Sequence, residues 1–213
     1  MAKFPTSMKN LFTLFALLIS AMAFSQRAND QYSIEAGYGL SLSGQPSILG
    51  YSHFEVGFRY MVDDLWGLKF DYGSDKFRTN ETPENGSDYS RFSVQGVHNL
   101  GRTLNFRDVT NNRLSLLAHG GLGYSSLKSV TLKGTDKIGN VIIGLTPQVR
   151  IVDNLALRAD ASVIFNFTQH FNFEGTYDDT GNGPKNAFTG NLFNFSLGLT
   201  YYFGKNGSNS DWR

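Results

Sequence analysis

Four histidines are the side chains that could act as a general base near neutral pH. None of them stands in a spaced pattern with a serine and an acid, so no hydrolytic triad is indicated. No histidine pair has zinc-ligand spacing, and the chain has no cysteine. We therefore expect no enzyme activity, no cofactor and no metal site, and we expect His119 to be a hydrogen-bonded filler. The four are His53, His98, His119 and His170.

The segment Asp178–Gly183 has part of the pattern of a calcium-binding loop, with oxygen-bearing side chains and a glycine at its sixth position. The acidic closing ligand is missing, because Thr189 stands at the twelfth position. Glycine, asparagine and aspartate are also ordinary turn residues. We interpret the segment as a solvated loop.

Nine charged residues share one face of segments in which apolar and polar residues alternate. Their signs nearly balance, and buried charges persist in proteins when they are paired. We predict an ion-pair network that fills the interior of the protein; a gated or conducting pore is the alternative. The nine are Glu35, Glu55, Arg59, Lys69, Asp71, Arg91, Arg150, Arg158 and Asp160.

The alternation has the period of a β-strand and recurs in eight runs, the first over 32–42 and the last over 193–203. The pairs Asp63-Asp64 and Asp153-Asn154 are predicted to form tight turns, and 74–88 and 171–190 long loops. Pro147 interrupts the sixth run. Because proline cannot donate to a ladder, we expect a bulge or a locally broken bond pair there.

Eight runs of about ten residues, with two of the connections very short, are typical of a small membrane barrel. An even strand count places the short turns on the periplasmic side, with the termini. The sequence therefore predicts an all-β fold, an eight-stranded antiparallel up-and-down transmembrane β-barrel.

The sizes of the side chains decide which face points inward. An eight-stranded barrel has an interior that side chains just fill. The apolar face carries too many Phe, Tyr and Leu residues to fit there, so we predict that it faces lipid; a lipocalin-like soluble barrel is the alternative. Trp66, Tyr60, Tyr72 and Tyr201 are predicted to mark the interfacial belts.

The N-terminal residues have the pattern of an export signal: Lys3 and Lys9 precede a short apolar core over 11–19, and small residues follow. We expect a cleaved signal over 1–25, a barrel over 26–204 and a polar tail over 205–213. A net charge of +1 without a basic stripe argues against nucleic-acid binding.

The last strand carries a glycine followed by aromatic residues two apart and ends on phenylalanine. This pattern is similar to the C-terminal signal by which the assembly machinery of outer-membrane barrels recognises its clients. The predicted signal residues are Gly198, Tyr201 and Phe203.

Three segments, over 91–97, 116–123 and 191–205, resemble the barrel domain of OmpA-family proteins of the Bacteroidetes. Members of that family usually continue into a domain that grips peptidoglycan. Here the residues after Gly204 are similar only to the start of the family's linker, so we do not expect this chain to anchor peptidoglycan.

The resemblance implies a structural role in the cell envelope, within the bacterial outer membrane. The expected partners are outer-membrane lipid and lipopolysaccharide, the assembly machinery, and a protein or surface ligand at the extracellular loops. A small passive porin-like channel and a subunit of a larger outer-membrane complex are the alternatives.

Overall fold

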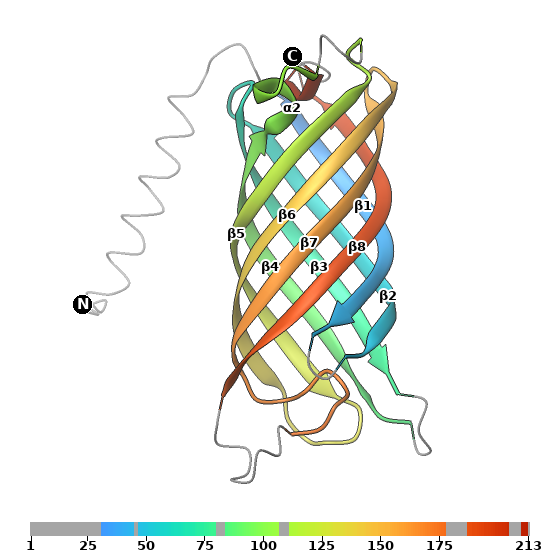
Figure 1. The fold of residues 1–213 in the computed structure, drawn as a ribbon, viewed down its shortest axis with the longest axis vertical. Coiled ribbons are helices and arrows are strands. Elements are labelled where there is room, and N and C mark those ends of the chain that lie inside the picture. Colours follow the sequence, from blue (N-terminus) through green and yellow to red (C-terminus); the bar gives the residue numbers. More distant parts are fainter. Residues whose placement is uncertain are drawn as a thin grey trace, which may run out of the picture.

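Eight antiparallel strands close into one barrel in the computed structural model of this chain (Figure 1). The strands follow one another in chain order, and β8 pairs with β1, which confirms the predicted up-and-down barrel. The strands are β1 Gln31–Ser43, β2 Leu49–Met61, β3 Trp66–Arg78, β4 Gly86–Asn99, β5 Leu114–Ser129, β6 Asp136–Val152, β7 Leu155–Gln169 and β8 Phe188–Phe203.

The structure describes residues 31–44, 47–79, 84–106, 111–177, 187–204 and 210–212. The predicted export signal over 1–25, the segment Asp178–Gly183 and the tail residues 205–209 lie outside the described residues.

The register of the ladders sets the tilt of the strands. If each residue is followed to its paired residue on the next strand, once around the barrel, a path that starts at Tyr32 returns to β1 at Leu42. The two positions are ten residues apart along β1. An offset of this size over eight strands corresponds to a tilt of about 40° from the barrel axis. At this strand number the interior has room for side chains and little else.

The short turns and the C-terminal residues lie at one end of the barrel (Figure 1). This end carries the turns over 62–65 and 153–154, the short helix α2 Leu100–Thr103 and the 3-10 helix η1 Ser210–Trp212. Asp63 caps its turn, because its Oδ1 accepts from the backbone N–H of Leu65 and Trp66, both at 2.7 Å. Both predicted tight turns are confirmed.

The loop predicted over 74–88 is wrong at both of its ends. β3 continues to Arg78 and β4 begins at Gly86, with Lys76 paired to Asp88. The apolar residue of this stretch, Phe77, points into the barrel and is fully buried. The alternation therefore persists, but its apolar side has changed from the outer to the inner face.

The ladder around Pro147 is locally broken. Of the two predicted outcomes, a bulge or a broken bond pair, the second is therefore confirmed. Pro147 pairs with Leu116 of β5, but neither it nor Thr146 has a partner on β7. The register is the same on both sides of this gap, so no residue is inserted there. The shift between β6 and β7 lies further along, between Arg150 and Val152.

Gly198 marks the seam where the barrel closes, and we predict that it tolerates no side chain. A Cβ there would lie 2.0 Å from the Ala36 carbonyl oxygen, whereas a Cβ at Gly139 would meet nothing within 4 Å. We expect Gly198→Ala to lower the free energy of unfolding by about 1–3 kcal/mol. Refolding into detergent micelles, followed by unheated gel migration and urea titration, measures this without the assembly machinery. Equal folding of Gly198→Ala and the control Gly139→Ala would contradict the packing account.

Candidate functional site

The middle of the barrel wall carries its apolar side chains on the outside and its charged side chains on the inside. Leu122, Phe92 and Ile143 are 69%, 65% and 59% exposed. Inward-facing Glu35 and Arg158, by contrast, are buried. This is the reverse of a water-soluble protein, where contiguous exposed apolar surface is limited to small patches.

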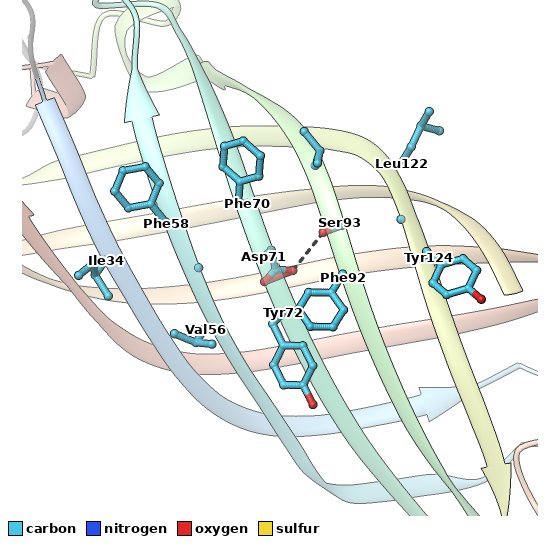
Figure 2. A pocket seen from close by; sticks show the side chains of 13 residues that line it. Ile34, Val56, Phe58, Phe70, Asp71, Tyr72, Phe92, Ser93, Leu122 and Tyr124 are labelled. Atoms are coloured by element: carbon cyan, nitrogen blue, oxygen red, sulfur yellow. Dashed lines mark hydrogen bonds between the residues drawn. The ribbon is translucent and has the colours of Figure 1, made fainter. Parts of the chain in front are cut away.

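Figure 2 shows part of the outer wall, where apolar side chains from β1 to β5 surround a shallow groove. The volume of the groove is about 700 Å³. Asp71 lies behind it and turns the other way, toward Ser93, whose hydroxyl donates to Oδ1 of Asp71 at 3.4 Å. The groove is lined by Ile34, Val56, Phe58, Phe70, Tyr72, Phe92, Val94, Leu122 and Tyr124.

Glu35 is the centre of the charged interior. Its carboxylate lies 3.3 Å from Arg59, 3.2 Å from Lys69 and 3.3 Å from Arg158. These distances join side-chain nitrogen and oxygen atoms of residues that are all at most 3% exposed. One carboxylate therefore holds three cations from three other strands.

Two further acids extend this group of charges. Arg158 also binds Glu55 and lies 3.8 Å from Asp160. Gly37 leaves room for this arginine, because a Cβ at that position would lie 3.0 Å from its Nη2. Arg91 forms a separate pair with Asp71 at 3.2 Å.

The structure places eight of the nine predicted network residues in the lumen, where they are buried. Arg150 is the ninth. It lies near the end of β6, half-buried, with its guanidinium carbon 5.2 Å from the centre of the Trp212 ring. The alternation pattern gave Arg150 the same face as the others but could not show that η1 covers it.

Sequence reasoning missed two histidine–aspartate pairs in the lumen. Nδ1 of His53 lies 2.6 Å from Oδ1 of Asp75, and Nε2 of His119 lies 3.0 Å from Oδ2 of Asp160. The other ring nitrogen of His119 is 2.5 Å from Oε1 of Gln95. Asp75 could have been identified by continuing the alternation of β3, in which every second residue points inward. The prediction of a loop over 74–88 ended that alternation too early.

A dry apolar cluster seals the lumen at the end with the long loops. Phe171 and Phe173 fold back from the β7–β8 connection and join inward side chains of the strands. Two hydroxyls fix this connection: Ser87 donates to the Phe173 carbonyl at 2.5 Å, and Ser129 donates to the Gly175 carbonyl at 2.7 Å. The cluster consists of Phe77, Tyr89, Leu127, Ile138, Ile142, Ile164, Phe171, Phe173 and Leu192.

This cluster corrects the expectation that the large apolar side chains all point outward. At this end of β3, β4 and β5 the outward residues are polar, as at Ser74, Ser90 and Ser126, whereas the inward residues Phe77, Tyr89 and Leu127 are apolar and buried.

The helix η1 seals the opposite end. Oδ2 of Asp211 accepts from Arg59 and from the Tyr202 hydroxyl, both at 2.7 Å. Burial raises the pKa of the Asp211 carboxyl, and the Arg59 guanidinium acts in the opposite direction. Trp212 packs beside Tyr202 and is only 4% exposed. The segment expected to be a polar tail thus includes three buried residues, 210–212.

Asn99 joins the parts of this seal. Its side-chain amide donates to the carbonyl oxygens of Ser210 at 2.9 Å and Asp64 at 3.2 Å. Its Oδ1 accepts from the backbone N–H of Arg102 at 3.0 Å and so caps α2. A single buried side chain therefore connects η1, the β2–β3 turn and α2.

The predicted assembly residues all lie on β8 along the closing seam. Gly198 pairs with Gly37, Tyr201 with Ile34 and Phe203 with Tyr32. Tyr201 and Phe203 face outward, at 49% and 37% exposed. Their recognition by an assembly machine stays a prediction.

Among the described residues, no helix has the length and apolar character needed to cross a membrane. The same part of the chain brings no three His, Asp or Glu side chains together where they could hold a metal ion.

We predict that Glu35→Gln is strongly destabilising, because it leaves three buried cations without their shared carboxylate. The expected loss is about 3–5 kcal/mol in the free energy of unfolding. Guanidinium titration of the protein in lipid vesicles measures it, with Glu84→Gln at an exposed position as the control. Adding Lys69→Met to Glu35→Gln is expected to restore part of the loss. If both glutamate variants unfold at the same denaturant concentration, Glu35 is not the centre of the network.

Comparison with known proteins shows similarity of fold alone. No protein-family model matches the chain, and no curated protein matches its sequence. Similar solved structures include a major outer membrane protein from Thermus thermophilus, with a TM-score of 0.54 and 14% identity, and Neisserial surface protein A, with 0.53 and 11%. The N-terminal β-barrel domain of OprF from Pseudomonas aeruginosa gives 0.51 and 13%.

These likenesses cover 83% of this chain and 100%, 98% and 100% of the three other chains, in the same order. The chain therefore has the fold of small outer-membrane β-barrel proteins.

Proposed function

We propose that this chain is a structural and surface-interaction barrel of the bacterial outer membrane, with a closed lumen and loops displayed on the cell surface. The proposal depends on one observation, which is that the barrel wall has its charged side chains inside and its apolar side chains outside. Buried ion pairs fill the inside and large apolar side chains cover the outside, which suits lipid on the outside rather than water.

The height of the apolar band supports the same proposal. The outward residues of β8 run without a polar interruption from Phe193 to Phe203. Ten residues on a strand tilted by about 40° rise about 25 Å, which is the height of the apolar band of outer-membrane barrels. A closed sheet also leaves no backbone edge to be satisfied within the lipid.

The two seals favour a closed barrel over a porin-like channel. Charged residues occupy the middle of the lumen, Phe171 and Phe173 cover one end, and Trp212 covers the other. An ion would have to displace both apolar clusters and then separate buried pairs. This arrangement suits a rigid scaffold that presents its loops.

The resemblance to the OmpA-family barrel belongs to the same proposal. Two of the segments that carry it lie side by side, because 91–97 of β4 pairs with 119–125 of β5. Export, the absence of enzyme activity and recognition by the assembly machinery are also proposed. They rest on the sequence patterns alone.

The two tryptophans offer a direct test of membrane insertion. Trp66 is exposed on the outer wall near the end with the short turns, whereas Trp212 is buried inside that end. We expect lipid brominated near its headgroups to quench the fluorescence of Trp66 alone. Each variant is refolded into vesicles and keeps one tryptophan. The fluorescence of Trp212→Phe therefore comes from Trp66, and the fluorescence of Trp66→Phe comes from Trp212. Equal quenching of the two variants, or none for Trp66, would argue against insertion in this orientation.

Because the lumen is closed, we predict that the protein does not conduct ions. In planar bilayers the refolded chain is expected to produce no stable conductance steps, because apolar clusters seal both ends of a charged interior. A large porin reconstituted in the same way is the positive control. Reproducible single-channel steps from the unaltered chain would reject the closed scaffold and support the channel alternative.

A further inference from the structure

Three outward rows of side chains lie one above another on β3, β4 and β5. The row nearest the bilayer centre joins Tyr72, Phe92 and Tyr124, which pair directly across the strands. Toward the loops follow a row of three serines and then a charged row. The serines are Ser74, Ser90 and Ser126, and the charged residues are Lys76, Asp88 and Lys128.

The row of Tyr72, Phe92 and Tyr124 forms one rim of the groove in Figure 2. On the side of this row that faces away from the long loops, the groove wall consists of aliphatic and aromatic side chains; the ring centres of Tyr72 and Phe92 are 4.7 Å apart. The outer face of β3–β5 therefore runs from the apolar groove past its aromatic rim to the row of hydroxyls and then to the charged residues. The order of apolar, hydroxyl and charged side chains along this face matches the order of chemical groups in a lipid, from its acyl chains to its headgroup.

The charged row has an excess of positive charge. Asp88 is paired with Arg78 at 2.5 Å. Among the residues that the structure describes, no carboxylate forms an ion pair with Lys76, Lys128 or the neighbouring Lys137. Lys76 and Lys128 stand two strands apart, about 10 Å, so one headgroup can reach both amines.

Lys137 adds a third cation beside the serine row. It pairs with Ser126 across β5 and β6 and is exposed on the outer wall. Because the strands tilt, this position on β6 lies nearly as far toward the loops as Lys128 on β5.

We propose that this face of β3–β6 binds a phosphorylated glycolipid of the outer leaflet. Its acyl chains lie in the groove of Figure 2, its sugar hydroxyls meet the serine row, and its phosphates pair with Lys76, Lys128 and Lys137. The proposal rests on the outer-membrane function proposed above, which places this end of the barrel in the outer leaflet.

Native mass spectrometry of the full-length mature chain in detergent, titrated with diphosphoryl lipid A, tests the proposal. We expect retention of one lipid A molecule and weaker retention of the monophosphoryl form. The variant Lys76→Ala/Lys128→Ala is expected to bind diphosphoryl lipid A about tenfold more weakly, because it removes two phosphate contacts. Phe92→Ala, in the groove, is expected to weaken both lipid A forms alike.

The control variant Arg102→Ala/Arg113→Ala removes the same charge at the opposite end of the barrel, in α2 and just before β5. It is expected to bind like the unaltered chain. Equal binding by both double variants would overturn the proposal. Equal retention of phosphatidylglycerol would show a general preference for anionic lipid and overturn it too. Competition by inorganic phosphate alone would reduce the site to a phosphate site and also overturn it.

Unheated gel migration of the same samples reports whether each variant is a folded barrel. If the unaltered chain does not bind lipid A, although it migrates normally and its Trp66 is quenched normally, the lipid site is contradicted but the proposed function stays intact. Failure of the unaltered chain to insert contradicts the proposed function itself.

Discussion

Closure of the sheet between β1 and β8 is the constraint on which the rest of the structure depends. It gives every strand a partner on both sides and fixes a narrow interior. Glycines at the seam, Gly37 and Gly198, allow the strands and the Arg158 guanidinium to approach closely. With the width fixed, charged and small side chains occupy the inside of the middle of the barrel, and the bulky apolar side chains of that part of the wall point outward.

The lumen is layered along its axis, and each layer has a different physical role. Desolvating the charged middle layer costs free energy, and the ion pairs among Glu35, Arg158 and their neighbours offset part of that cost. The apolar end layers keep water from these pairs. The loop that carries Phe173 and the helix η1 therefore act as parts of the interior, although neither belongs to a strand.

The alternation in the sequence predicted most of the wall, because a lipid-facing strand and a packed lumen both require a strict period of two. It identified Glu35, Arg59 and Arg158 as inward charges, and the structure places them together. It did not predict Phe77 as an inward residue, because the apolar side of the pattern changes face near the end of β3. The folding back of Trp212 depends on contacts with Tyr202 and Arg150 that no local pattern contains.

The outward and inward faces of β4 provide the most direct test of this account, because the chain has no native cysteine. In vesicles, a spin label on Val94→Cys is predicted to collide with oxygen dissolved in the lipid and to be shielded from a water-soluble nickel chelate. Ser93→Cys, one residue away and buried, is predicted to react with a water-soluble thiol reagent only after unfolding. Rapid reaction at position 93 in the folded protein, or contact of the label at position 94 with the nickel chelate, would contradict an inside that is charged and an outside that faces lipid.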